Sequence, residues 1–231
     1  MLDNCYYNKI FLPLHQIYKN INKNMTSNIE VLKKYMIDLG LPMTFEQAQK
    51  SDLFFDIQLI RRGKDHPKMP AANYTFKTYY ITSIEKFDWF IGEIKKCCDM
   101  FGLRAYISVN AKSKEEALKK TCERYAHNIV TNDYRSPWKS FSSVCGSLDG
   151  EEKRWVVDID NLKVRESILK FIRNCESKYD DPYVCDIPTR NGCHIITHPF
   201  NLQRFNKMCM EENIEVPEVK KNHLTLLYEN L

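Results

Sequence analysis

Short segments of strand-like composition alternate with amphipathic helical segments along most of this 231-residue chain. The strand segments are rich in β-branched and aromatic residues, and the helical segments carry apolar residues three and four positions apart. The expected strands cover 53–61, 75–82, 104–110, 154–160, 184–187, 192–197 and 224–228, and the expected helices cover 28–40, 44–50, 84–102, 114–130, 162–176 and 202–213. This alternation predicts α/β layers in which helices pack on sheets. Short strands with hairpin-like connections favour mixed (α+β) sheets over purely parallel ones.

The length allows one large domain or two small, fused lobes. Residues 1–28 are expected to be an accessory N-terminal segment or linker, since 19–28 is dense in Asn and Lys. Residues 29–150 would form an N-terminal α/β unit and 151–231 a C-terminal unit, which together make one compact domain. The polar stretch 131–150 is expected to be a loop at the boundary between them.

Composition excludes several classes of protein. The mean hydropathy is −0.49 and no apolar run reaches 18 residues, so no membrane partner is expected. Nine cysteines without a C-x-x-C pair argue against a zinc ribbon, and the lack of a secretory signal predicts reduced thiols in the cytoplasm. The net charge of +4 is concentrated in 51–150, which permits a polyanionic partner without requiring one.

The first candidate motif is the strand segment VVDID, which ends in Asp158 and Asp160. Residues two apart on a strand face the same way, about 6.6–6.8 Å apart along the chain. Two carboxylates on one face suit Mg²⁺ or Mn²⁺, which prefer oxygen ligands. The alternative is that Asp160 or Asn161 caps the next helix while Asp158 is an exposed strand residue.

The second candidate motif runs from a polar turn into an apolar strand: Arg190, Asn191, Gly192, Cys193 and His194. An Asn-Gly turn exposes backbone N–H groups to an anion, and arginine offers a planar fork for phosphate. The histidine can donate a hydrogen bond to phosphate or act as an acid or base. The alternative is a simple hairpin turn with His194 hydrogen-bonded in the core.

Taken together, the two motifs resemble motifs I and II of the archaeo-eukaryotic primase superfamily: apolar residues with D-x-D, then a helix, then a small residue two positions before histidine. The resemblance covers roughly 50–231 and implies an N-terminal α/β unit followed by an RRM-like unit. The family's third motif, an apolar residue followed by aspartate, has no clear counterpart, because no aspartate follows His194. Glu218, Asn222 and Glu229 are the candidates for its place.

The resemblance implies a primase or primase-polymerase that transfers nucleotidyl groups on a DNA or RNA template. Asp158 and Asp160, with Glu218 as the third acid, would hold Mg²⁺ or Mn²⁺, and His194 would contact the phosphates of a nucleoside triphosphate. The residues expected to complete the phosphate site are Arg190, Asn191, Gly192, Lys220 and Lys221. A stand-alone core of this kind would fit a phage or mobile-element replication protein, working with a helicase or an accessory subunit.

A basic and aromatic segment lies earlier in the chain. Arg61, Arg62 and Lys64 cluster at a turn and are followed by aromatics from Tyr74 to Tyr80. Basic residues beside aromatics can track a single nucleic-acid strand, so these three and Arg104 are candidates for nucleic-acid contact. The alternative is that the aromatics belong to the sheet and core.

Two further functions use the same residues differently. A metal-dependent phosphoesterase or nuclease would use the same carboxylates to shorten nucleic acid rather than to extend it. A degenerate module without the third acid would bind a nucleotide or nucleic acid without turnover.

Overall fold

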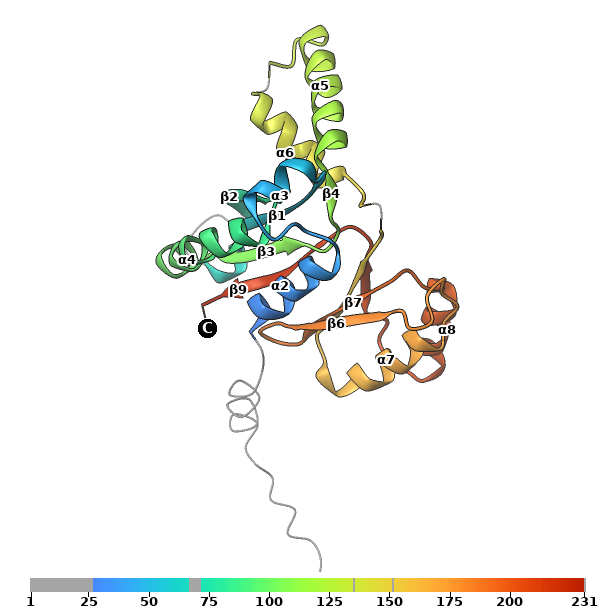
Figure 1. Cartoon of the computed structure of the whole chain (residues 1–231). Coiled ribbons are helices and arrows are strands. Elements are labelled where there is room, and N and C mark those ends of the chain that lie inside the picture. Colours follow the sequence, from blue (N-terminus) through green and yellow to red (C-terminus); the bar gives the residue numbers. More distant parts are fainter. Residues whose placement is uncertain (1–26, 67–71, 135, 151, 231) are drawn as a thin grey trace, which may run out of the picture.

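The computed structural model describes residues 27–66, 72–134, 136–150 and 152–230, and these form a mixed α/β structure with two antiparallel sheets and seven α-helices (Figure 1). The helices are α2 (Asn28–Asp38), α3 (Phe45–Lys50), α4 (Ile84–Phe101), α5 (Lys114–Val130), α6 (Pro137–Ser147), α7 (Arg165–Arg173) and α8 (Leu202–Glu211). The strands are β1 (Leu53–Arg61), β2 (Tyr74–Ile81), β3 (Arg104–Ser108), β4 (Lys112–Ser113), β5 (Trp155–Ile159), β6 (Tyr183–Pro188), β7 (Cys193–Thr197), β8 (Glu218–Lys220) and β9 (Leu224–Glu229). Single 3₁₀ turns cover Gly63–Asp65 and Leu162–Val164. The predicted accessory segment 1–28 lies outside the described residues except for its last two.

The first sheet has the strand order β2-β1-β3-β9, with β4 paired to the start of β1. Alternate residues of β1, namely Phe55, Ile57 and Leu59, are completely buried because they face a core shared with helices α2 and α4. Helix α4 begins at the N-cap Ser83 and ends at Gly102, whose φ of +60° is the left-handed conformation that glycine adopts readily. The predicted helix over 84–102 is therefore confirmed, with its last residue acting as the cap.

The second sheet has the order β6-β7-β5-β8 and is buried on both faces near its centre. Val157 and Ile159 of β5 pack in a core with helices α7 and α8. Val156 on the same strand faces the other way and joins the core of the first sheet, together with Ile187 and Ile196. The two sheets are thus held together by one continuous core, in which β9 and α2 lie next to β6.

The last strand returns to the first sheet. β9 pairs with β3, so the chain places its C-terminal strand in the sheet begun by β1, although β8, just before it, belongs to the second sheet. The described strands all pair antiparallel, whereas the sequence predicted mixed sheets. Helices α4, α7 and α8 each connect two parallel strands that flank a third, antiparallel strand, so β2-α4-β3, β5-α7-β6 and β7-α8-β8 are split βαβ units.

The prediction of a polar loop over 131–150 is wrong for 137–147, which form α6. Ser136 caps this helix and Pro137 occupies its first position, a combination that favours a helix start. Val144, together with Cys145 and Leu148, buries against Phe54 of β1, so tertiary packing stabilises a segment whose composition is polar overall.

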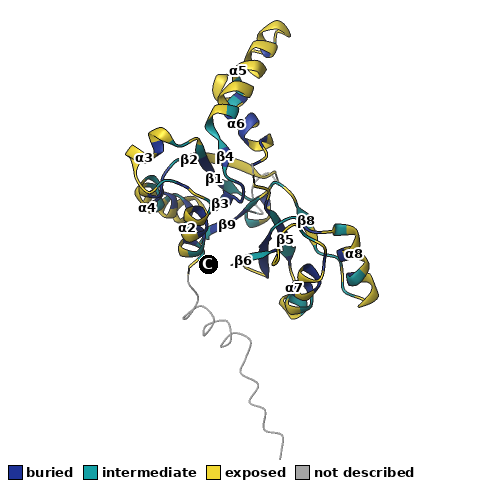
Figure 2. Cartoon of the chain, turned by 45° about the vertical axis from the view of Figure 1, so that its right-hand side comes forward, coloured by how far each residue is buried: buried dark blue, intermediate teal, exposed yellow. Residues whose placement is uncertain are grey.

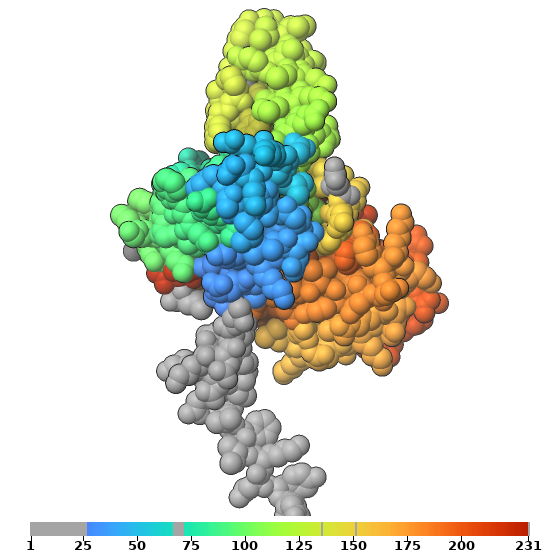
Figure 3. Space-filling view, viewed as in Figure 1, coloured from blue at the N-terminus to red at the C-terminus, as the bar shows by residue number. Residues whose placement is uncertain are grey.

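Helices α5 and α6 form a hairpin that projects away from both sheets (Figures 1 and 3). The outer surface of α5 is largely exposed, while the buried residues gather where the sheets and helices meet (Figure 2). Of the helices that the structure describes, none is long and apolar enough to cross a membrane.

Candidate functional site

The acidic motif and the histidine motif lie on adjacent strands of the second sheet. Asp158 on β5 stands directly opposite His194 on β7 in the antiparallel register. Paired residues of this kind project to the same face of a sheet, and the Asp158 Oδ1 and His194 Nε2 atoms are 3.5 Å apart. Val156 and Ile196 share this face and belong to the core of the first sheet. The carboxylate and the imidazole therefore meet on the side that faces the first sheet.

Gly192 permits this register because no side chain would fit at its position. A Cβ atom there would lie 1.8 Å from the carbonyl oxygen of Ile159 and 3.0 Å from the Cα of Asp160. The turn is closed by the Thr189 N–H, which donates to the Gly192 carbonyl at 3.0 Å, and by the Gly192 N–H, which donates to Thr189 Oγ1 at 3.2 Å. The glycine thus lets the β6–β7 turn rest directly on the end of β5.

A residue that sequence reasoning missed holds the other side of the imidazole. Thr225 on β9 is completely buried, and its Oγ1 atom lies 2.9 Å from His194 Nδ1. In the neutral tautomer with its proton on Nε2, the ring accepts from the Thr225 hydroxyl and turns its N–H toward Asp158. The available signal was a hydroxyl residue in the otherwise apolar strand LTLLY, but only the fold shows that this strand meets β7.

Lys220 and Glu218 complete the face from strand β8. Lys220 Nζ lies 2.9 Å from Asp158 Oδ2 and 3.1 Å from Glu218 Oε2, and Glu218 stands opposite Asp158 in the register. The His194 imidazole and the Lys220 ammonium hold the pKa of Asp158 well below its usual range, against the opposing effect of partial burial. Burial lowers the pKa of Lys220, but the hydrogen bonds to Asp158 and Glu218 outweigh it and raise that pKa. Both groups are charged at neutral pH.

The predicted metal ligands do not form a closed cage. Asp160 is the first residue after β5 and is exposed, and the Glu218 side chain is 69% exposed. Within the part of the chain that the structure describes, no three His, Cys, Asp or Glu side chains gather closely enough to hold a metal ion. Mg²⁺ is usually bound by one or two carboxylates together with substrate phosphates rather than by an all-protein cage. The residues present therefore fit an ion that arrives with a phosphate ligand better than a permanently bound one.

Arg190 and Arg104 belong to an ionic cluster that joins the two sheets. Arg104 on β3 contacts Asp65 Oδ2 at 2.7 Å and Glu229 Oε2 at 3.1 Å, and its side chain is 9% exposed. Arg190, on the β6–β7 turn, reaches the same Glu229 oxygen at 3.4 Å but remains 46% exposed. Arg104 is thus committed to two carboxylates inside the fold, whereas half of Arg190 and its exposed neighbour Asn191 are open to a ligand.

Lys221 and Asn222 contact other residues than Lys220 does. The Lys221 ammonium lies 5.4 Å from the centre of the Trp155 ring, which packs in the core on the opposite face of the second sheet. Asn222 donates to the carbonyl of Leu148 at 2.8 Å and accepts from Asn110, so it fastens the connection between the units. Neither side chain lies with Asp158, and Glu229 lies in the Arg104 cluster instead.

The predicted nucleic-acid residues at the end of β1 lie beside the Arg104 cluster, which Asp65 of the same turn contacts, rather than with Asp158. Arg62 Nη1 donates to the hydroxyl of Tyr106 at 3.3 Å, and Lys64 is exposed on the short helix that follows. Arg61 lines a surface hollow beside strand β2. β1 is two strands away from β9 in the first sheet, whereas Asp158 lies in the second sheet, so these residues do not join the Asp158 face.

Comparisons with known proteins identify no relative of this chain. No family model matches the chain, and neither a curated protein nor a solved structure matches it. The site is therefore described by its chemistry: an ionised carboxylate, an imidazole with a fixed partner on each side, and a charged lysine on one sheet face. Such a face can bind an anion with its cations and can bind a metal–phosphate complex with its carboxylate.

Proposed function

We propose that this chain is a nucleotidyltransferase of DNA replication or priming, with a two-lobed core of the primase type and the second sheet as its RRM-like unit. The observation that carries the proposal is the direct pairing of Asp158 with His194 across β5 and β7. In this proposal the sheet face that they share binds a nucleoside triphosphate together with Mg²⁺ or Mn²⁺.

The proposed reaction joins a 3′-oxygen to the α-phosphorus of the triphosphate. The bond from that phosphorus to the pyrophosphate oxygen breaks, pyrophosphate leaves with the electron pair, and the hydroxyl proton passes to solvent. Such a transfer depends on positioning and charge neutralisation, so a side-chain nucleophile is not required. The bound metal ion would supply charge neutralisation at the phosphates.

The residues of the face have distinct roles in this proposal. Asp158, ionised at neutral pH, and Asp160 would hold the ion. His194, fixed by Thr225, would donate a hydrogen bond from the Nε2–H that faces Asp158 to a phosphate oxygen bound beside that carboxylate. Lys220, which already contacts Asp158, would neutralise further phosphate charge, and the exposed half of Arg190 on the β6–β7 turn would contact the more distant phosphates.

Primer extension tests the proposal directly. A labelled primer on a DNA or RNA template is incubated with nucleoside triphosphates and Mg²⁺ or Mn²⁺, and products are separated by length. We expect extension by the native chain and a loss of at least about 100-fold for Asp158→Ala, since one charge-stabilising group typically contributes a factor of that order. Asp180→Ala, which changes an exposed acid outside the face, is the matched control. No extension with either metal, or equal rates in both variants, would contradict the proposal, and shortened primers would indicate a nuclease.

A second candidate function is nucleotide binding without turnover. Two observations favour it. The Lys220 ammonium contacts Asp158 Oδ2, an oxygen that a metal ion would need. Among the described residues, no three metal-ligating side chains gather at Asp158. In that case nucleoside triphosphates would raise the melting temperature of the chain while primer length stays constant. Extension of the primer by the native chain would exclude this alternative.

A further inference from the structure

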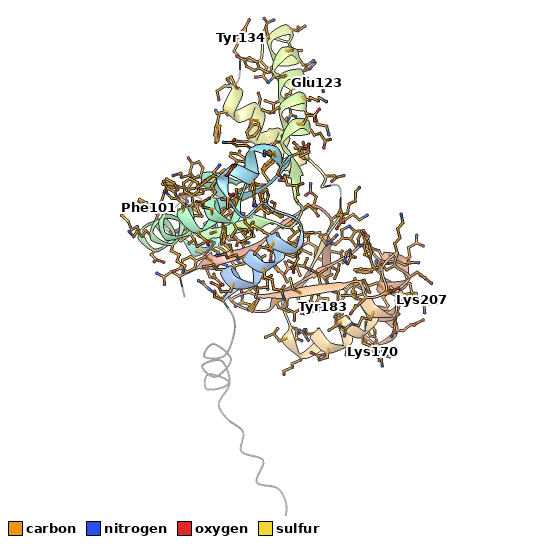
Figure 4. All side chains as sticks on the ribbon, viewed as in Figure 1. Phe101, Glu123, Tyr134, Lys170, Tyr183 and Lys207 are labelled. Atoms are coloured by element: carbon orange, nitrogen blue, oxygen red, sulfur yellow. The ribbon has the colours of Figure 1, made fainter. Side chains whose placement is uncertain are left out.

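A surface hollow lies at the edge of the first sheet, and none of its lining residues belongs to the Asp158 face. It has a volume of about 740 Å³, within the range of small-ligand sites, and lies between the start of β2, the end of α4 and the turn after β1. It is lined by Arg61, His66, Tyr74, Phe76, Met100, Phe101, Gly102 and Leu103. Figure 4 places Phe101 at the end of α4, on the opposite side of the molecule from the labelled residues of α7 and α8.

Aromatic side chains at this hollow are exposed rather than packed in the core. Tyr74 is 59% exposed, Phe76 44% and Phe101 48%. The Phe76 and Phe101 rings lie 5.1 Å apart with an interplanar angle of 31°, so they form a tilted pair at the surface. Exposed aromatic rings that gather at one hollow mark it as a candidate interaction surface.

The His66 ring, which lines the hollow, is held in place by the backbone at Gly102. Gly102 ends α4 in the left-handed conformation, and its missing Cβ makes room for the His66 ring, whose Cε1 would otherwise lie 2.9 Å away. His66 Nε2 is 2.9 Å from the Gly102 carbonyl oxygen. The imidazole is therefore held against the end of the helix, beside the aromatic pair.

The turn beside the hollow carries more basic than acidic side chains. The turn after β1 carries Arg61, Arg62 and Lys64, and its acid, Asp65, is neutralised inside the fold by two hydrogen bonds from Arg104. Lys64 is exposed, so its ammonium faces solvent beside the hollow. Basic side chains next to exposed aromatic rings form the combination that binds single-stranded nucleic acid, with phosphates on the cations and bases on the rings.

We propose that this hollow binds an unpaired base of a single-stranded nucleic acid, stacked on Phe76, Phe101 and Tyr74, with an adjoining phosphate at Lys64. The inference rests on the proposed function, because it names where the template strand is gripped. β2 and β9 are three strand spacings apart, on the order of 14 Å, and Thr225 of β9 contacts His194, so a strand of several nucleotides that leaves the hollow can cross the first sheet toward that contact.

Fluorescence anisotropy with labelled single-stranded oligonucleotides, without nucleotide or metal, tests this inference separately from catalysis. We expect Phe76→Ala and Phe101→Ala each to weaken binding roughly 5- to 100-fold, the range for loss of one stacked base, and Phe76→Trp to restore it. The matched control is Trp89→Ala, which removes another exposed ring, 73% exposed and in edge contact with Phe45.

Two variants of opposite charge at one exposed position test the inference without disturbing the fold. Met100 lines the hollow and is 75% exposed, so its replacement should not disturb the core. We expect Met100→Glu to weaken binding and Met100→Lys to strengthen it, and we expect the difference to shrink with added salt. Single-stranded DNA and RNA are compared with duplex in the same assay. Equal affinity of the Phe76, Phe101 and native chains, equal losses in the Trp89 control, or no binding by the native chain would overturn the inference, whatever primer extension shows.

Discussion

Gly192→Ala provides the most direct measurement of how the two motifs are joined. The new Cβ would lie 1.8 Å from the Ile159 carbonyl oxygen, whereas ordinary contact begins near 3.4 Å, so the turn and β5 must separate by about 1.6 Å. The obstacle is backbone, which cannot rotate away as a flexible side chain can. The separation would break the pairing of Ile159 with Cys193 and strain both hydrogen bonds of the turn to Thr189.

The expected cost follows from these losses. Overpacking a filled site costs about 1–3 kcal/mol, and a lost hydrogen bond about 1 kcal/mol, so the free energy of unfolding should fall by roughly 3 kcal/mol. At about 2–4 °C per kcal/mol for a chain of this size, the melting temperature should fall by roughly 6–12 °C. Urea unfolding followed by circular dichroism measures the first quantity and a thermal melt the second.

Two other glycines serve as controls with the opposite sign. Gly92 in α4 and Gly146 in α6 have no atom within 4 Å of a built Cβ, so alanine there should leave stability unchanged or raise it by about 0.5–1 kcal/mol. If Gly192→Ala unfolds within 0.5 kcal/mol of the native chain, the close approach of turn and strand described above is wrong.

Three further outcomes follow from charged and polar contacts. Lys112→Met should cost about 3–5 kcal/mol in urea unfolding, because it leaves Asp56 charged and 1% exposed without its partner, and Asp56→Leu in the same chain should recover most of that loss. Because folding lowers the pKa of Asp158, this carboxylate stabilises the folded chain above its unfolded pKa near 4, and the stabilisation is lost as pH falls below that value. The free energy of unfolding of Asp158→Asn should therefore fall less between pH 5 and pH 3 than that of the native chain. Equal pH dependence of the two free energies would contradict this. Thr225→Val should cost about 1 kcal/mol and shift the Nδ1 resonance of His194 in nitrogen NMR, whereas an unchanged resonance would show that the hydroxyl does not hold the ring.

Local patterns were enough to predict most elements of the fold. The apolar spacing of Phe87, Ile94 and Cys98, with Ser83 before and Gly102 after, fixes α4 because periodicity and capping agree. The same logic failed for 137–147, where burial of Val144 and Leu148 against β1 decides the outcome. Ser136 and Pro137 are a local signal for a helix start, but the packing that stabilises the helix involves a strand some 90 positions earlier, so the polar average was misleading there.

The candidate site divides along the same line. Alternation along β5 and β7 predicted that each motif presents its polar residue to one face, and the structure places Asp158 opposite His194. Contacts that depend on long-range topology were not predictable: Thr225 reaches His194 only because β9 closes the first sheet, and Arg104 is buried only because Asp65 and Glu229 converge on it. Residue type thus indicated the chemistry of the site, while strand order determined which residues contact one another there.

Lys220 raises the question of how a metal ion would gain access to Asp158, and Glu218 supplies an answer. The Lys220 ammonium contacts both carboxylates, at 2.9 Å and 3.1 Å, and is 21% exposed, so it can shift toward Glu218 and an incoming phosphate without losing every charged partner. Glu218 would then act by receiving the lysine rather than by binding the ion. We therefore expect Glu218→Gln to weaken the Mn²⁺-dependent binding of a nucleoside triphosphate several-fold, because Lys220 would stay on Asp158. We expect Lys220→Met in the same chain to restore the Mn²⁺ dependence of binding.

Isothermal titration of the triphosphate with and without Mn²⁺ measures this dependence in each variant. Glu215→Gln, which changes an exposed acid outside the face, is the control. A Glu218→Gln loss that Lys220→Met does not relieve would mean that Glu218 binds the ion itself.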